Sequence, residues 1–453
     1  MQVTNGKTNP FENSPPPRPD SPKRTAEQQA PEYQHLKFTL HRKLLDRINL
    51  EALSSLASER MRIEVRVAVA RLVEEEKTPL SLVEKDRVIE EILDEVFGLG
   101  PLEPLLQDNT VSDILVSGPK LVYVERSGKL QRVPVEFKDN AHLLRIIEKI
   151  VSRVGRRVDE SSPMVDARLP DGSRVNAAIS PIAIDGPLLS IRRFGRTALK
   201  GEDLVGKLAL TNGMLDFLKG AVKARLNIII SGGTGSGKTT LLNALSGYIA
   251  EDERIVTIED AAELRLQQTH VARMETRPPN IEGQGSISIR QLVVNALRMR
   301  PDRIIVGECR SDEALDMLQA MNTGHDGSLT TVHANTPRDA VARLEVMVGM
   351  ASASMGARSI RQQISSAVDL FVQVSRMSDG SRRVTHITEV IGMEGDVITL
   401  QDVFVFEKLG INEKGTVLGR FKPTGLRPHS TERMKNAGFQ LPPEMFTTVV
   451  EIS

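Results

Sequence analysis

The sequence of 453 residues contains no tryptophan, three tyrosines and a single cysteine. Aromatic residues make up 3% of the chain, against 40% for all hydrophobic residues, so its core must be aliphatic and rich in methionine. The lone Cys309 excludes an internal disulfide framework and is typical of a protein in a reducing compartment.

The sequence also lacks a charge excess of either sign. Lysine plus arginine and aspartate plus glutamate each number 59, so the formal net charge is zero. Nucleic-acid-binding proteins usually carry a basic excess, so nucleic acid is not an expected partner. No stretch approaches the roughly 20 uninterrupted apolar residues of a membrane span, and Met1–Asp20 lacks the apolar core of a signal peptide. We therefore expect a cytoplasmic protein whose membrane role is peripheral.

Composition and periodicity divide the chain into five segments. Residues 1–36 are rich in proline and polar residues, and are predicted to be a disordered arm. Apolar residues recur every three or four positions across 37–100, which predicts a small helical bundle. Short strands and one helix predict an α/β domain over 101–196, and the polar stretch 197–208 predicts a linker. Strands and helices then alternate within 209–453, which predicts a parallel sheet with crossover helices and a C-terminal extension.

A phosphate-binding loop is the clearest motif. The apolar run Leu226–Ile230 leads into Gly-Gly-Thr-Gly-Ser-Gly-Lys-Thr, which fits the pattern G-x-x-x-x-G-K-[ST]. Glycines allow the backbone to curl, so that its N–H groups converge on phosphate oxygens at the start of a helix. Lys238 should reach the β- and γ-phosphates and the Thr239 hydroxyl should bind Mg²⁺, so ATP and Mg²⁺ are the predicted cofactors. The residues predicted to hold the nucleotide are Gly232, Gly233, Thr234, Gly235, Ser236, Gly237, Lys238, Thr239 and Thr240.

Two further apolar runs end in acidic residues. One predicted strand is followed by Glu308, and another by Glu259 and Asp260. ATP hydrolysis needs carboxylates at the ends of neighbouring strands to hold Mg²⁺ and to orient the attacking water. Either Glu259 or Glu308 is predicted to polarise the water while the other lies near the metal, and the sequence leaves this choice open. Thr239 and Asp260 complete the predicted metal ligands.

Histidines and arginines supply the remaining catalytic candidates. His325 lies in a predicted loop and His333 ends the strand that follows, and both are predicted to sense the γ-phosphate. In ring-shaped motors, an arginine supplied by a neighbouring subunit can stabilise the charge of the transition state. Arg174 and Arg192, in the predicted α/β domain, are our candidates for this role. Further candidates are Arg298 and Arg300.

The order of these motifs resembles that of the type II/IV secretion ATPase superfamily. Three runs resemble more closely its tight-adherence (Tad, or CpaF-type) pilus branch: Pro163–Arg174, Glu275–Asn280 and Asn295–Asp302. The resemblance covers about residues 90–408. The chain departs from the pattern at Ser311-Asp312, where this branch would have two glycines.

The resemblance implies a RecA-like P-loop NTPase domain at the C-terminus, preceded by a small α/β (PAS-like) domain and a helical bundle. It also implies a homohexamer that docks on an integral inner-membrane platform protein and extracts pilin subunits. Such a motor would hydrolyse Mg-ATP at the cytoplasmic face of the inner membrane to assemble a Tad or type IV pilus, and retraction by the same motor is admissible in this branch.

Three other functions fit part of the sequence. A type IV or type II secretion ATPase that exports protein or nucleoprotein would share the same catalytic motifs. A hexameric nucleic-acid translocase would also share the P-loop, but the neutral net charge argues against it. A scaffold without catalytic activity is disfavoured by the intact Lys238, Thr239, Glu259 and Glu308.

Overall fold

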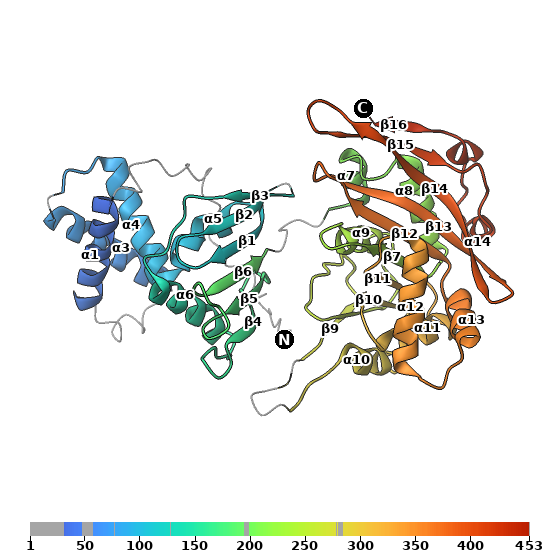
Figure 1. Ribbon diagram of the computed structural model, residues 1–453, viewed down its shortest axis with the longest axis horizontal. Coiled ribbons are helices and arrows are strands. Elements are labelled where there is room, and N and C mark those ends of the chain that lie inside the picture. Colours follow the sequence, from blue (N-terminus) through green and yellow to red (C-terminus); the bar gives the residue numbers. More distant parts are fainter. Residues whose placement is uncertain are drawn as a thin grey trace, which may run out of the picture. The chain divides into compact units, whose positions relative to one another are not determined.

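The computed structural model describes residues 31–47, 58–76, 78–126, 128–193, 199–277, 279 and 284–452. The contacts divide the chain into two compact units, Met1–Arg196 and Thr197–Ser453, and each is described by itself (Figure 1). Most of the predicted arm, residues 1–30, lies outside the described residues. Among the helices that are described, none is both long enough and apolar enough to cross a membrane.

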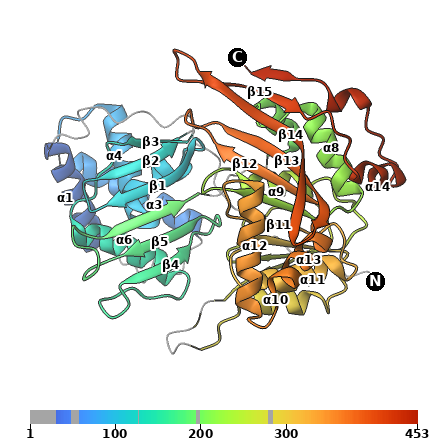
Figure 2. The ribbon, with the colours of Figure 1, turned by 45° about the vertical axis from the view of Figure 1, so that its right-hand side comes forward.

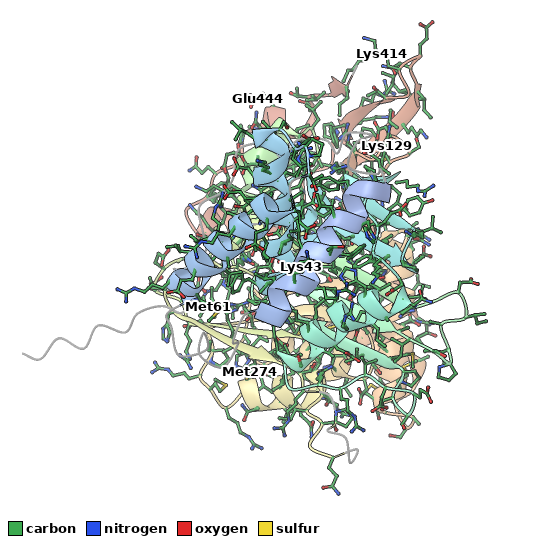
Figure 3. All side chains as sticks on the ribbon, turned by 90° about the vertical axis from the view of Figure 1, so that its left-hand side faces the viewer. Lys43, Met61, Lys129, Met274, Lys414 and Glu444 are labelled. Atoms are coloured by element: carbon green, nitrogen blue, oxygen red, sulfur yellow. The ribbon has the colours of Figure 1, made fainter. Side chains whose placement is uncertain are left out.

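A helical bundle opens the first unit. Its helices are α1 (Pro31–Arg47), α3 (Ser58–Glu75) and α4 (Leu82–Phe97). The helix α1 begins inside the segment that the sequence analysis assigned to a disordered arm, because Tyr33 and Leu40 are buried against the other two helices. Charged side chains cover the outside of the bundle, such as Lys43 on α1, which pairs with Glu76 (Figure 3).

An antiparallel sheet of six strands forms the rest of the first unit, in the order β3-β2-β1-β6-β5-β4. The strands are β1 (Val111–Ser117), β2 (Val122–Arg126), β3 (Lys129–Arg132), β4 (Met164–Arg168), β5 (Arg174–Ala178) and β6 (Leu188–Arg192). The helix α6 (Asn140–Ser152) packs on this sheet, with Leu143 and Ile147 in one core with Ile114. The short helices η2 (Gly100–Leu102) and α5 (Glu103–Gln107) connect the bundle to the sheet.

The second unit is built on a sheet of ten strands, in the order β16-β15-β14-β13-β12-β7-β11-β10-β8-β9. Its parallel part consists of β7 (Ile228–Gly232), β8 (Ile255–Glu259), β9 (Val271–Glu275), β10 (Arg303–Cys309), β11 (Leu329–Val332) and β12 (Leu370–Arg376). This parallel sheet with crossover helices is the predicted RecA-like α/β fold.

Helices cover both faces of this sheet (Figure 2). They are α8 (Asn212–Lys223), α9 (Lys238–Ser246), α10 (Ile289–Ala296), α11 (Glu313–Asn322), α12 (Pro337–Ala351) and α13 (Ala357–Ala367). Side chains alternate between the faces of a strand. Accordingly Ile228 and Ile230 of β7 share a core with α8 and α9, whereas Ile229 lies in the core with α10 to α13.

The C-terminal extension continues the sheet with antiparallel strands. Its elements are β13 (Arg382–Glu394), β14 (Val397–Ile411), β15 (Val417–Pro423), α14 (Ser430–Asn436), η3 (Pro443–Phe446) and β16 (Val450–Ile452). The strands β14 and β15 pair as a long antiparallel hairpin. The final apolar segment is part of the core, since Phe446 packs with Phe217 and Phe404.

The predicted linker 197–208 contains a helix, α7 (Gly201–Gly206). The Asp203 carboxylate accepts a hydrogen bond from the backbone N–H of Lys200 at 2.8 Å, which stabilises the first turn. Leu204 is buried in the core of the second unit. The polar composition of residues 197–208 therefore did not reveal this short amphipathic helix.

Candidate functional site

The phosphate-binding loop lies where a central strand of the second unit ends. All five residues of β7 are buried, and the strand lies between β11 and β12. Gly235 and Gly237 have φ values of +67° and +101°, in the left-handed region that favours glycine. The helix α9 begins at Lys238, directly after the loop. The partial positive charge at the start of this helix favours a bound phosphate.

Three functional side chains meet at the loop. Lys238 Nζ lies 3.2 Å from Gly233 O, 3.2 Å from His333 Nε2 and 3.7 Å from Glu308 Oε1. His333 Nε2 is 3.1 Å from Glu308 Oε1. Burial, followed by the charge of Lys238, lowers the pKa of His333, so its imidazole is neutral at pH 7. The structure therefore brings Lys238, Glu308 and His333 together.

Arg310 connects two of the predicted acidic residues. Its Nε donates to Glu308 Oε2 at 2.7 Å and its Nη1 donates to Asp260 Oδ2 at 3.0 Å. The sequence analysis noted this segment only for its departure at Ser311-Asp312. The signal for Arg310 was its position two residues after Glu308, at the end of β10.

Glu259 occupies a different environment from Glu308. It is 3% exposed, and its Oε2 accepts hydrogen bonds from the backbone N–H groups of Glu263 at 2.6 Å and Leu264 at 2.9 Å. Burial raises its pKa above the ordinary value, against the opposing effect of these two hydrogen bonds. A Cβ on Gly307 would lie 3.0 Å from Glu259 Cγ. Gly307 is thus small because Glu259 packs against it.

The structure does not bring His325 to this site. The carboxyl ends of parallel strands share one edge of the sheet, and the P-loop, Glu308 and His333 all lie at that edge. His325 precedes β11, and its carbonyl accepts a hydrogen bond from Ser328 Oγ at 2.7 Å. A strand runs from one edge of a sheet to the other, so His325 and His333 lie at opposite edges. Of the two histidines, His333 is the one beside Lys238 in this structure, and a γ-phosphate role for His325 stays a prediction.

Of the predicted arginines, Arg174 and Arg192 lie in the first unit. Arg298 and Arg300 lie in the second unit, away from its P-loop. Arg298 and Arg300 precede β10, so they lie at the amino edge of the parallel sheet. In the first unit, Arg174 is the cross-strand neighbour of both Arg192 and Arg168. Three arginines thus form a row across β4, β5 and β6, and their action on a neighbouring subunit stays a prediction.

The carboxyl edge of the sheet carries oxygen donors of the kind that Mg²⁺ prefers. They include the Thr239 hydroxyl at the start of α9 and the carboxylates of Glu308 and Glu259. Glu259 Oε1 is buried and has no hydrogen-bond partner within the described part of the chain. Asp260, the remaining predicted ligand, shares the Arg310 guanidinium with Glu308. These residues fit a Mg²⁺ ion held mainly by nucleotide phosphates.

Two residues of β12 and β13 that the sequence did not single out contact the site. Gln373 accepts a hydrogen bond from Ser231 Oγ, and its Nε2 donates to Ala334 O at 3.2 Å, next to His333. Arg382 Nε donates to Gly235 O at 3.3 Å, although the two residues are 147 positions apart. No local pattern marks these residues, because only the order of strands in the sheet brings them to the loop.

Known proteins resemble this chain over its central part. The family described as "Type II/IV secretion system protein" matches residues 95–402. A protein of Mycobacterium tuberculosis H37Rv, whose name proposes a role in conjugal transfer, is 38% identical over 309 residues, which are 67% of this chain and 87% of that protein. The type IV secretion system protein VirB11 of Bartonella henselae is 31% identical, over 64% of this chain and 91% of its own.

A solved structure, that of the VirB11 ATPase from the Brucella suis type IV secretion system in complex with sulphate, is 28% identical, with a TM-score of 0.36. The match covers 65% of this chain and 97% of the chain in that structure. The family match spans the α/β domain of the first unit as well as the P-loop, Glu308 and His333. The chain belongs to the type II/IV secretion system protein family and is an ATPase.

Proposed function

We propose that this chain is a hexameric motor that hydrolyses Mg-ATP to drive assembly of a Tad or type IV pilus. The observation that supports an ATP-driven motor is that Lys238, Glu308 and His333 lie within 3.7 Å of one another at the end of the phosphate-binding loop. The choice of a pilus rests on the three runs of sequence that resemble the tight-adherence branch. Retraction of the same pilus by this motor is compatible with that resemblance.

Within the site, each residue has a distinct proposed role. The loop N–H groups and Lys238 bind the phosphates, and Thr239 holds the metal. A bound Mg²⁺ neutralises charge that develops on the phosphate oxygens. Glu308 polarises the attacking water, because it lies next to Lys238 and His333. Glu259 lies on the metal side, where its Oε1 has no partner within the described residues.

The proposed assembly is a homohexamer. Each subunit would present Arg174 and Arg192 to the nucleotide of its neighbour, and their adjacent positions on β5 and β6 would let them act together. The ring would dock from the cytoplasm on an integral inner-membrane platform protein, through which it acts on pilin subunits. Nucleic acid is not a proposed partner, in keeping with the zero net charge.

Secretion is the second candidate function. The relatives in Mycobacterium and Bartonella carry names of conjugal transfer and type IV secretion proteins. A motor of that kind would export protein or nucleoprotein rather than assemble a pilus. It would use the same nucleotide site, so the site cannot separate the two functions.

Substitution of Lys238 by alanine in the native gene separates them. We expect this change to abolish productive phosphate binding and surface pili, as counted on labelled cells, while secreted proteins stay at wild-type levels. Complementation with the wild-type gene is the control and should restore the pili. Persistence of pili together with loss of a secreted or transferred substrate would contradict pilus assembly and support the secretion candidate.

A further inference from the structure

The turn between β12 and β13 places two arginines beside the phosphate-binding loop. Arg376 ends β12, Arg382 begins β13, and the two are paired across the strands. Arg382 Nε donates to Gly235 O at 3.3 Å. A Cβ built on Gly237 would lie 3.7 Å from Arg382 Cγ, and one on Gly235 would lie 3.5 Å from Arg376 Nη1. Both side chains therefore lie against the tip of the loop.

The strand order explains this proximity. The strand β12 pairs in parallel with β7, and Val374 lies opposite Gly232. The approach is so close that a Cβ on Gly232 would lie 2.4 Å from Val374 O. The end of β12 therefore runs beside the loop, and the turn that follows crosses next to Gly235 and Gly237.

Hydrogen bonds hold this turn in place from two sides. The Asp379 carboxylate accepts from Ser381 N and from Val417 N of β15, both at 2.9 Å. Burial opposes the ionisation of Asp379, but a hydrogen bond from the Ser381 hydroxyl, together with these two bonds, lowers its pKa to about 2, so it is ionised at pH 7. Next to Arg382, Val384 N donates to Ala209 O at 2.7 Å. Arg382 thus projects from a fixed backbone, which lowers the entropic cost of the contact that it makes.

The contact with Gly235 O has a consequence for the loop. In a planar trans peptide, the carbonyl and the following N–H point in opposite directions. A donor on Gly235 O therefore favours the Ser236 N–H on the opposite side of the peptide, where it donates a 3.4 Å hydrogen bond to Gly233 O of the same loop. The inside of such a loop is where phosphate oxygens bind.

We propose that Arg382 is a positioning residue for the phosphate-binding loop, which it holds with the Gly235–Ser236 peptide oriented for phosphate. This proposal rests on the nucleotide site of the proposed function and adds a residue to it. Lost positioning weakens ground-state and transition-state binding alike, so KM should rise while kcat stays near its wild-type value.

The test compares Arg382→Ala, Arg382→Lys and the control Arg420→Ala in the full-length protein. Arg420 lies on β15, where its side chain pairs with Glu407. Binding of Mg-ADP is measured by calorimetry, together with KM and kcat for Mg-ATP and the melting temperature. We expect Arg382→Ala to raise Kd and KM about tenfold, with kcat within twofold of the wild type. Lysine should restore most of the loss, and Arg420→Ala should bind like the wild type.

Salt separates positioning from simple attraction of charges. Attraction between exposed charges is screened between about 0.05 and 0.5 M salt, whereas a fixed loop geometry is not. The ratio of the Arg382→Ala and wild-type Kd values should therefore stay constant over this range. A ratio that falls to one at high salt, or a variant that binds within twofold of the wild type, would overturn the proposal. A wild type that binds no nucleotide would overturn the proposed function, and this inference with it.

Discussion

At the scale of single residues, Lys238 is paired with a carboxylate of its own subunit. The residue is 7% exposed, and its ammonium group lies 3.7 Å from the Glu308 carboxylate. A buried charge without a partner would be strongly destabilising, so this pair stabilises the loop before nucleotide binds. Phosphate would then take over Lys238 and leave Glu308 to orient water. The Glu308 carboxylate thus pairs with Lys238 in the absence of nucleotide and orients water when nucleotide is bound.

Glu259 offers a prediction that separates stability from activity. Burial raises its pKa above the ordinary value of 4.5, so its ionised form disfavours the nucleotide-free fold at neutral pH. Glu259→Gln should therefore raise the melting temperature of the nucleotide-free protein at pH 7, while kcat falls roughly 10–100-fold. This gain in melting temperature should shrink as the pH falls below 4.5, where the Glu259 side chain is protonated in both the folded and the unfolded state.

The matched control is Glu275→Gln. Glu275 lies beside Glu259 on the neighbouring strand β9, but its side chain is exposed. This change should leave the melting temperature unaltered at both pH values. A Glu259→Gln protein that melts below the wild type at pH 7 would show that the carboxylate is a net stabilising group.

At the scale of elements, the strongly patterned segments were predicted well. The strand before the P-loop, expected at Leu226–Ile230, is β7 at Ile228–Gly232, and the helix after the loop is α9. The helix predicted within the α/β domain over 101–196 is α6 at Asn140–Ser152. Glycine and proline mark the ends of such segments, and the spacing of their buried apolar residues distinguishes a helix from a strand. Local sequence therefore suffices to place them.

Elements and contacts that depend on distant partners were missed. The strand β3 has four exposed residues and forms only because β2 pairs with it. The separation of His325 from His333 follows from the direction of β11 through the sheet, which a motif cannot convey. Gln373 and Arg382 reach the site only through the position of β12 beside β7.

The C-terminal extension gives a prediction about stability. Phe446 is 5% exposed and packs with the rings of Phe404 and Phe217, so Phe446→Ala should lower the free energy of unfolding by about 3–5 kcal/mol. Unfolding in urea of the full-length protein measures this loss. Val449→Ala, at a residue 44% exposed, should change it by less than about 0.5 kcal/mol. Equal effects of the two changes would mean that the tail does not belong to the core.

At the scale of the whole molecule, the proposed ring predicts complementation between subunits. Lys238→Ala subunits and Arg174→Ala/Arg192→Ala subunits should each be inactive alone. In an equal mixture, an intact P-loop faces a neighbour with intact Arg174 and Arg192 at about one quarter of the interfaces. About one quarter of the wild-type activity should therefore return. Steady-state ATP hydrolysis after reassembly measures it. No recovery on mixing would mean that the arginines act on the nucleotide of their own subunit.

The proposed function depends on Glu308, beside Lys238 and His333, serving the hydrolysis of Mg-ATP. Its most direct test is steady-state Mg-ATP hydrolysis by the purified wild type and by Glu308→Gln, with Mg-ADP binding measured on both. We predict that kcat falls about 10²–10³-fold while Kd for Mg-ADP does not rise, because the carboxylate acts on the water and competes with the phosphates for Lys238 rather than binding them. Hydrolysis by Glu308→Gln within tenfold of the wild type would contradict this role of Glu308.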